Sequence, residues 1–290
     1  MMAGVVRQCA LPNPSFDLAW EAIKIPQEIR IRITNQAVLS LTIKQKLPFE
    51  VAPLHGFILL AGPPGTGKTT LAFGLASRVA HALHKEKVSF LQIDTHSLAS
   101  AALGQSQQQA TKLFRQTIPE ASLQGPCIVL LDEVETLAVD RHRLSLEANP
   151  IDVHRATDAV LTGLDFLAHE QKKILIIATT NFIEAVDKAL LSRADLIEEI
   201  GLPDPAAREQ IISDTLVNLG GTWPKVLDLK RDLPSFVKVS EGMDGRCLRK
   251  SIITAATTSL ETAQDLNKLT AQDILKTLKS SRRMKQGTKS

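Results

Sequence analysis

The sequence from Phe57 to Thr69 reads FILLAGPPGTGKT. Its first five residues are continuously apolar, which is typical of a strand covered on both faces of a sheet. The remainder satisfies the phosphate-loop pattern G-x-x-x-x-G-K-T, directly after a strand and at the start of a helix, where that pattern functions. Glycines let the backbone turn tightly, so that its N–H groups and the helix N-terminus face phosphates. The alternative, a glycine-rich turn without a ligand, does not account for the complete motif in this position.

The phosphate loop predicts most of a nucleotide site. We expect Lys68 to reach the β- and γ-phosphates of ATP, and we expect the hydroxyl of Thr69 to bind Mg²⁺. The predicted nucleotide-binding residues of this segment are Gly62, Pro63, Pro64, Gly65, Thr66, Gly67, Lys68, Thr69 and Thr70.

A second strand-like run, from Ile128 to Leu131, ends in Asp132 and Glu133. Two adjacent carboxylates after a buried strand are costly unless a cation or a bound water compensates them. We expect Asp132 to support the nucleotide and its Mg²⁺, and Glu133 to orient and activate the attacking water. Such a pair alone can simply begin a loop, but its place in the next strand but one after the phosphate loop indicates an ATPase.

Runs of strand length alternate with helical stretches along the first two thirds of the chain. The strand candidates are FILLA from Phe57, VSFLQI from Val88, CIVLL from Cys127 and KILIIA from Lys173, and the helix candidates span 68–84, 105–117 and 155–169. Continuous apolar strands alternating with helices are typical of an α/β fold with a parallel sheet sandwiched between helices.

The pattern becomes helical beyond Leu202. We therefore predict a large P-loop domain over residues 1–202, a smaller helical lid domain over 203–280 and a basic tail over 281–290. The segment from Thr270 to Asp273 reads TAQD, which is typical of a capping box that opens a last helix.

Composition excludes several classes of protein. The chain is 44% hydrophobic and 22% charged, as in ordinary globular proteins. No apolar run is long enough to span a bilayer, and the first residues lack the apolar stretch of a secretory signal, so we expect a cytoplasmic protein without a membrane partner. Its three cysteines are far apart with no CxxC pair, which argues against a disulfide framework or a zinc site.

The net charge of +3 is concentrated at the C-terminus. The last fifteen residues hold six basic residues and no acid, so the rest of the chain is mildly acidic. This pattern favours a solvated terminus over a DNA-binding arm, because no basic stripe with interleaved aromatic residues accompanies it. We do not expect a nucleic-acid partner.

Six further stretches carry a family resemblance. They are HSLASAALGQSQQQATKLF from His96, DEVETLA from Asp132, DAVLTGLDFL from Asp158, ATTN from Ala178, LLSRADLIEEIGLPD from Leu190 and EGMDGRCLRK from Glu241. In these motifs the chain resembles the pachytene-checkpoint AAA+ remodellers, of the thyroid-hormone-receptor-interactor-thirteen type, which act on HORMA-domain proteins. The similarity runs from about Phe16 to Lys250, some four fifths of the chain.

The resemblance implies three further roles. Asn181 matches the sensor-1 position, Arg193 in SRAD matches the arginine finger that reaches into a neighbouring subunit's site, and Arg246 matches the sensor-2 arginine of the lid. A site completed in trans implies a ring, most simply a homo-hexamer. The alternatives are that Asn181 caps a loop, that Arg193 pairs with Asp195, and that Arg246 is a surface residue.

The chain departs from the family at the first pore loop. Members that thread their substrate place an aromatic residue there, whereas the matching positions of this chain are Ala101, Ala102, Leu103 and Gly104. Leu103 is the one sizeable apolar group among them, which weakens the expectation of vigorous threading. A second pore segment is expected between Asp140 and Arg155, with a solvated loop as its alternative.

Length is the second departure. Only 61 residues precede Gly62, which leaves little room for the substrate-recruiting domain of eukaryotic members. The short form resembles prokaryotic members, which are associated with HORMA-domain partners and nucleotidyltransferases in phage defence. The resemblance implies an ATP-driven ring that opens a HORMA-domain protein and so disassembles its complex. The alternatives are a nucleotide-gated scaffold with little turnover and a DNA-associated AAA+ loader.

Overall fold

The computed structural model describes residues 4–84, 87–100, 105–138 and 150–287. These residues divide into two compact units, which we describe separately. The first comprises Met1–Gly62 with Lys68–Ile200, and the second comprises Pro63–Gly67 with Gly201–Ser290. The domain limits expected at residues 202 and 280 stay predictions, although the last described helix continues through residues 281–287 without a break.

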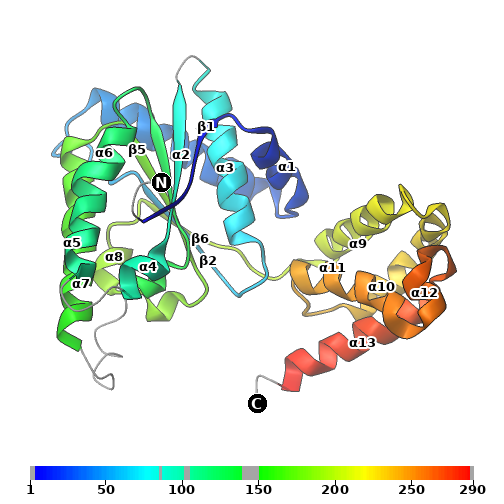
Figure 1. Cartoon of the computed structure of the whole chain (residues 1–290). Helices are drawn as coiled ribbons and strands as arrows, with labels where there is room; N and C mark the ends of the chain where they lie inside the picture. The colour runs from blue at the N-terminus through cyan, green and yellow to red at the C-terminus, as the bar shows by residue number, and fades with distance from the viewer. Residues whose placement is uncertain (1–3, 85–86, 101–104, 139–149, 288–290) are drawn as a thin grey trace. The chain divides into compact units, whose positions relative to one another are not determined.

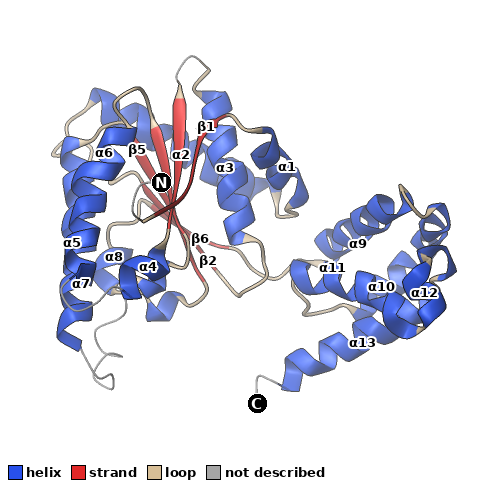
Figure 2. Ribbon diagram, in the orientation of Figure 1, coloured by secondary structure: helices blue, strands red, loops and turns tan. Residues whose placement is uncertain are grey.

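The described part of the first unit is built on one six-stranded sheet (Figures 1 and 2), in the order β1-β3-β4-β5-β2-β6. The strands from β3 to β6 pair in parallel, and β1 pairs antiparallel with β3 at one edge. The predicted α/β fold with a parallel sheet is thereby confirmed, and the antiparallel edge strand β1 is an addition to it. The strands are β1 (Val5–Leu11), β2 (Phe57–Ala61), β3 (Val88–Ile93), β4 (Cys127–Leu131), β5 (Ile174–Thr180) and β6 (Leu196–Glu199).

Two of these strands were not expected from the sequence, namely β1 and β6. Both lie at the edges of the sheet. β1 buries only Val5 and Leu11, at its two ends, and Glu198 is the single buried residue of β6. An edge strand leaves one side in water, so it lacks the continuous apolar run that marks β2, β4 and β5. Every residue of those three strands is buried.

Helices cover both faces of the sheet, as Figure 1 shows. Successive strand residues point to opposite faces. In β2, Phe57 and Leu59 therefore join the core on one face, while Ile58 and Leu60 join the core on the other. The helices of the first unit are α1 (Pro14–Ala22), α2 (Gln27–Lys46), α3 (Lys68–Ala82), α4 (Thr95–Ser100), α5 (Gln105–Lys112), α6 (Ile118–Ala121), α7 (Pro150–Glu170) and α8 (Lys188–Leu191).

The described part of the second unit beyond residue 200 is helical, with its own core around Phe236, Leu248 and Ile274. The predicted capping box is confirmed. The Thr270 N–H donates to Asp273 Oδ2 (3.0 Å), and the Asp273 N–H donates to Thr270 Oγ1 (3.3 Å). The helices of this unit are α9 (Pro205–Gly220), α10 (Leu233–Val239), α11 (Gly245–Thr254), α12 (Leu260–Gln264) and α13 (Ala271–Gly287). None of the helices within the described ranges has the length and apolarity that a bilayer crossing demands.

A buried lysine in the first unit gives a prediction about stability. Lys44 of α2 is 4% exposed, and its Nζ donates to the carbonyl oxygens of His55 (2.9 Å) and Ile174 (3.2 Å). Burial lowers the pKa of Lys44 from 10.5 to about 8, although the charge of Asp195 opposes the shift. Because the folded-state pKa is the lower one, the unfolded chain binds more protons between these two values, and stability rises with pH across this window.

When the pH rises from about 7.5 to about 10, we therefore expect the unfolding free energy of the wild type to increase by about 2 kcal/mol more than that of Lys44→Met. Urea unfolding of both chains at both pH values measures this difference. The buried thiol of Cys127, whose pKa is raised to about 11 by burial, is present in both chains and cancels. Equal pH slopes for the two chains would contradict a lowered pKa of Lys44 in the folded protein.

Candidate nucleotide and hydrolysis site

The phosphate loop connects β2 to α3 and contains positions whose backbone favours glycine. Gly62 has φ +143°, and a Cβ built on it would lie 2.2 Å from the carbonyl oxygen of Ile200. Gly67 has φ +93° and directly precedes the first residue of α3. The first N–H groups of a helix have no partner within it, and the helix dipole adds positive potential there. The start of α3 thus fits the phosphates of a nucleotide.

Lys68 and Asn181 lie far apart in the sequence, but the structure brings them together. Lys68 is 5% exposed, and its Nζ donates to the Gly62 carbonyl oxygen (2.7 Å) and to Asn181 Oδ1 (2.9 Å). Asn181 directly follows β5, the strand beside β2. Two of the residues predicted for the site are therefore in direct contact.

Asp132 lies against two threonine hydroxyl groups. Its Oδ1 accepts hydrogen bonds from Thr69 Oγ1 (2.8 Å) and from Thr179 Oγ1 (2.5 Å). Sheet register explains the second contact. Leu131 of β4 is level with Ala178 of β5, so the next residue of each strand falls at the same edge of the sheet.

Glu133 combines an unusual backbone with a carboxylate held from two sides. Its φ of +54° and ψ of +56° lie in the left-handed region, which is uncommon for a residue other than glycine and often marks a functional site. Oε1 accepts from Asn181 Nδ2 (3.1 Å), and Oε2 lies 3.0 Å from His96 Nε2. The Glu133 N–H donates to Thr179 Oγ1 (3.0 Å). An oriented, half-exposed carboxylate of this kind is suited to act as a general base toward water.

Four residues of this network were not assigned a role from the sequence, namely Thr95, His96, Glu135 and Thr179. Thr95 Oγ1 donates to the Asp132 carbonyl oxygen (2.6 Å), and Glu135 Oε1 accepts from the Asn181 N–H (3.0 Å). The other carboxylate oxygen of Glu135 is buried without a hydrogen-bond partner among the described residues. Position is the signal that identifies Thr95 and Thr179, because both stand at the carboxyl ends of strands that flank β4.

Thr179 gives a prediction, because its hydroxyl contacts both Asp132 and the Glu133 backbone. We expect Thr179→Val, which preserves the side-chain shape, to lower kcat about tenfold with little change in nucleotide affinity. The control is Thr180→Val on the same strand. Thr180 is equally buried, but its hydroxyl accepts from the Phe182 N–H instead. Steady-state ATPase assays with nucleotide titrations test this, and equal effects of the two substitutions would contradict it.

The structure places the remaining predicted residues as follows. Arg246 is exposed in the first turn of α11, in the second unit, and its N–H donates to the carbonyl oxygen of Gly65 in the phosphate loop (3.3 Å). The pore positions Ala101, Ala102, Leu103 and Gly104 are outside the described residues, as is the stretch 140–149 of the second pore segment. Arg193 follows α8 and pairs with Asp165 of α7, with Nε 2.7 Å from Oδ1 and Nη2 2.8 Å from Oδ2.

The alternative pairing of Arg193 with Asp195 is wrong. Asp195 instead accepts hydrogen bonds from three consecutive backbone N–H groups just before and at the start of β2, those of His55 (2.9 Å), Gly56 (2.7 Å) and Phe57 (3.0 Å). A carboxylate held by several backbone donors has a structural role of its own. The side chain of Arg193 is therefore not bound to its near neighbour in the sequence.

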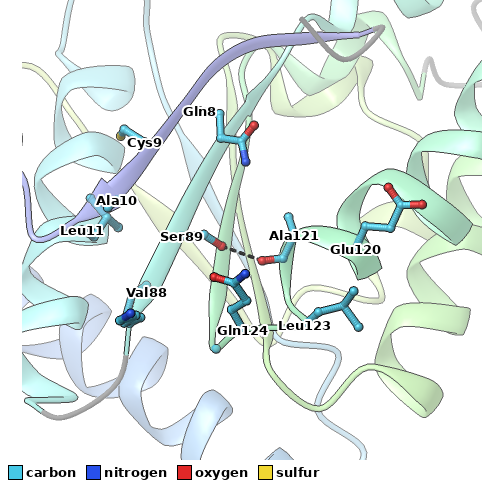
Figure 3. Close-up of a pocket in the computed structure, with 12 residues that line it drawn as sticks. Gln8, Cys9, Ala10, Leu11, Val88, Ser89, Glu120, Ala121, Leu123 and Gln124 are labelled. Carbon is cyan, nitrogen blue, oxygen red and sulfur yellow. Dashed lines mark hydrogen bonds between the residues drawn. The ribbon is translucent and has the colours of Figure 1, made fainter.

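A separate pocket of about 650 Å³ lies beside β1 and the start of β3 (Figure 3). Gln8 and Cys9 line it from β1, and Ser89 of β3 donates from Oγ to the Ala121 carbonyl oxygen (2.9 Å) in its wall. Partial burial raises the pKa of the Cys9 thiol, which keeps it protonated at neutral pH. The pocket adjoins the start of β3 and the loop before β4, whereas Asp132 follows the end of β4, and none of the predicted site residues lines it.

Comparison with known proteins identifies the family. Residues 58–202 match the family described as ATPase family associated with various cellular activities (AAA), a range that contains Lys68, Asp132, Glu133 and Asn181. The chain belongs to the AAA family of ATPases. This AAA ATPase is 44% identical over 284 residues to CD-NTase-associated protein 6 of Pseudomonas aeruginosa, covering 97% of this chain and 93% of that protein. Family membership shows nucleotide binding and ATPase activity.

The AAA ATPase is also 30% identical over 263 residues to the putative pachytene checkpoint protein 2 of Caenorhabditis elegans. That match covers 82% of this chain but 62% of the relative, so the chain spans less than two thirds of it. The predicted pachytene-checkpoint resemblance is confirmed.

Two solved structures share the fold. The structure of C. elegans PCH-2 has a TM-score of 0.77 at 23% identity, covering 99% of this chain and 78% of that one. A chain in the E. coli MS115-1 HORMA:CdnC:Trip13 complex has a TM-score of 0.73 at 18% identity, covering 95% of this chain and 94% of that one.

Proposed function

We propose that this AAA ATPase works as a ring, most simply a homo-hexamer, that uses ATP to open a HORMA-domain protein and disassemble its complex. The observation that carries the proposal is the 44% identity to CD-NTase-associated protein 6, which extends over 97% of the chain. The fold shared with a chain of the E. coli MS115-1 HORMA:CdnC:Trip13 complex supports it, because that complex contains a HORMA protein assembled with a third protein. We infer that the complex controls a nucleotidyltransferase in phage defence, in the cytoplasm.

Mg²⁺ fits the residues at the start of α3. The Thr69 hydroxyl and the Asp132 carboxylate lie 2.8 Å apart, and both are hard oxygen donors of the kind that Mg²⁺ prefers. We propose that these two residues hold the ion and that residues 62–70 hold ATP. Bound Mg²⁺ would supply positive charge that offsets charge on the phosphates.

The chain's own residues then have distinct roles in hydrolysis. Glu133 accepts the proton of the attacking water, and Asn181 fixes the orientation of the Glu133 carboxylate through its Nδ2 hydrogen bond. Lys68 is positioned by Asn181 and by the Gly62 carbonyl oxygen. Arg193 of one protomer contributes its guanidinium to the site of the next, and Arg246 links nucleotide state to movement of the helical unit.

A disassembly assay tests the proposed function. The AAA ATPase is mixed with ATP and a HORMA-domain protein closed around its ligand peptide, and release of a fluorescent peptide is followed by anisotropy. We expect release by the wild type and none by Glu133→Gln, which should instead remain bound to the HORMA protein in the presence of ATP. Peptide that stays bound with an actively hydrolysing wild type would contradict the proposal.

A nucleotide-gated scaffold with little turnover is the second candidate. One observation favours it, because Ala101, Ala102, Leu103 and Gly104 offer no aromatic group to grip a substrate. Steady-state ATPase rates separate the two candidates. A wild-type rate well above that of Glu133→Gln supports the remodelling ring, whereas equal background rates support the scaffold.

A further inference from the structure

The proposed arginine finger is held by an unusually complete set of contacts within its own protomer. Arg193 forms a bidentate salt bridge with Asp165, in which Nε donates to Oδ1 (2.7 Å) and Nη2 donates to Oδ2 (2.8 Å). Its Nη1 donates to the Ala189 carbonyl oxygen (2.7 Å). Within the described residues, these bonds use three of the five N–H donors of the guanidinium. The plane of the group is thereby fixed, while donors remain for another ligand.

Arg193 and Asp165 come from elements of different length. Arg193 itself follows α8, a helix of only four residues. Asp165 belongs to the 21-residue helix α7, where Leu164 and Leu167 on either side of it are each 1% exposed in the core. A long helix with one face in the core therefore holds a side chain that would otherwise extend from a short surface segment.

Electrostatics keeps the pair ionised. The hydrogen bond from Arg193 lowers the pKa of the Asp165 carboxyl and, in turn, the bond to Asp165 raises the pKa of Arg193. The ring of His55 also faces Asp165, with Nε2 3.4 Å from Oδ1. Burial lowers the pKa of His55, so its ring is uncharged at neutral pH. The positive charge beside Asp165 is then that of Arg193.

We propose that Asp165 is the positioning residue of the arginine finger, and that it presents the Arg193 guanidinium to the nucleotide of the neighbouring protomer. This inference rests on the proposed ring function. The Arg193 side chain is 21% exposed, so it stays accessible while it is paired. An arginine side chain loses considerable rotamer freedom when it is fixed. Asp165 fixes it before the subunits meet, so less entropy is lost when the composite site forms.

Kinetics of Asp165→Asn provide the first test. The amide keeps the size of the carboxylate but replaces one acceptor with a donor, so the bidentate salt bridge with Arg193 is lost. We expect kcat to fall about tenfold with KM changed less than about twofold. Glu170→Gln, which removes one negative charge from an exposed position on the same helix, should retain the wild-type kcat. In the Arg193→Ala background, Asp165→Asn should cause no further loss, because its effect passes through Arg193.

Rings assembled from two different variants provide the second test. A general structural role of Asp165 would not give the result expected here. An Arg193→Ala protomer can still hydrolyse ATP if its neighbour supplies a guanidinium, and a Glu133→Gln protomer can supply one. We expect the mixture of these two inactive chains to regain ATPase activity. Adding Asp165→Asn to the Glu133→Gln chain should lower the regained activity about tenfold, whereas adding it to the Arg193→Ala chain should leave the activity unchanged.

The outcomes separate the inference from the function on which it rests. The regained activity could fall equally when Asp165→Asn is added to the Glu133→Gln chain and when it is added to the Arg193→Ala chain, or it could fall in neither case. Either result would overturn the role of Asp165 while the ring function stands. An increase in kcat for Asp165→Asn would also overturn it, because Asp165 would then withhold Arg193. No regained activity in any mixture would overturn the shared site and this inference together. If Asp165→Asn does not fold, Asp165→Ser, which keeps one acceptor but cannot form the pair, should show the same pattern.

Discussion

Replacing Glu133 with glutamine should lower the ATPase rate by about 10²–10⁴-fold while nucleotide remains bound. The structure explains why so small a change has this effect. Glu133 holds a left-handed backbone, and its carboxylate is oriented by Asn181 and His96, so an amide in the same place retains the shape but cannot accept a proton from water. Single-turnover hydrolysis measures the rate, and nucleotide binding by calorimetry measures the affinity.

Two results would contradict this assignment. A rate within a few-fold of the wild type would show that another group is the base. Loss of nucleotide affinity together with rate would show that Glu133 supports the binding site and not the chemical step. Glu184→Gln, at an exposed position of the short turn after β5, is the matched control and should keep the wild-type rate.

The second large effect is expected from Arg193→Ala, which should reduce kcat by about 10³-fold or more with little change in nucleotide affinity. A guanidinium that acts on developing charge contributes to the rate and not to ground-state binding. In the structure Arg193 pairs with Asp165, whereas Lys68 and Glu133 both contact Asn181. This arrangement is consistent with action of Arg193 on a different protomer's site.

Arg193→Lys sharpens this test. Lysine keeps the charge but cannot form the bidentate salt bridge with Asp165. We therefore expect Arg193→Lys to recover only a small part of the ATPase rate that is lost in Arg193→Ala. Comparable losses of kcat and of nucleotide affinity in Arg193→Ala would contradict an arginine finger. Size-exclusion chromatography of the variant should show the same assembly as the wild type.

The sequence predicted the centre of the sheet and of the site, because both depend on local patterns. The apolar runs of β2, β4 and β5 and the phosphate loop are continuous in the chain, and their physical meaning does not depend on distant partners. The edge strands β1 and β6 escaped prediction since each has one exposed side. The contact of Thr179 with Asp132 was missed because it depends on the register between two strands.

Side-chain pairing was the least predictable feature. Sequence proximity suggested Asp195 as the partner of Arg193, but Asp195 is occupied by three backbone N–H groups at the start of β2. Its actual partner, Asp165, lies 28 residues away on α7. No local pattern distinguishes these two carboxylates, and only the packing of α7 against the sheet does so.

The central claim is that each ATP is hydrolysed by two protomers, with Glu133 from one and Arg193 from the next. Its most direct test is the ATPase rate of an equal mixture of Glu133→Gln and Arg193→Ala chains, each of which is inactive alone. If protomers exchange freely, about a quarter of the interfaces combine an intact Glu133 with an intact Arg193, and the mixture should reach about a quarter of the wild-type rate. A mixture no more active than its two components would contradict the account.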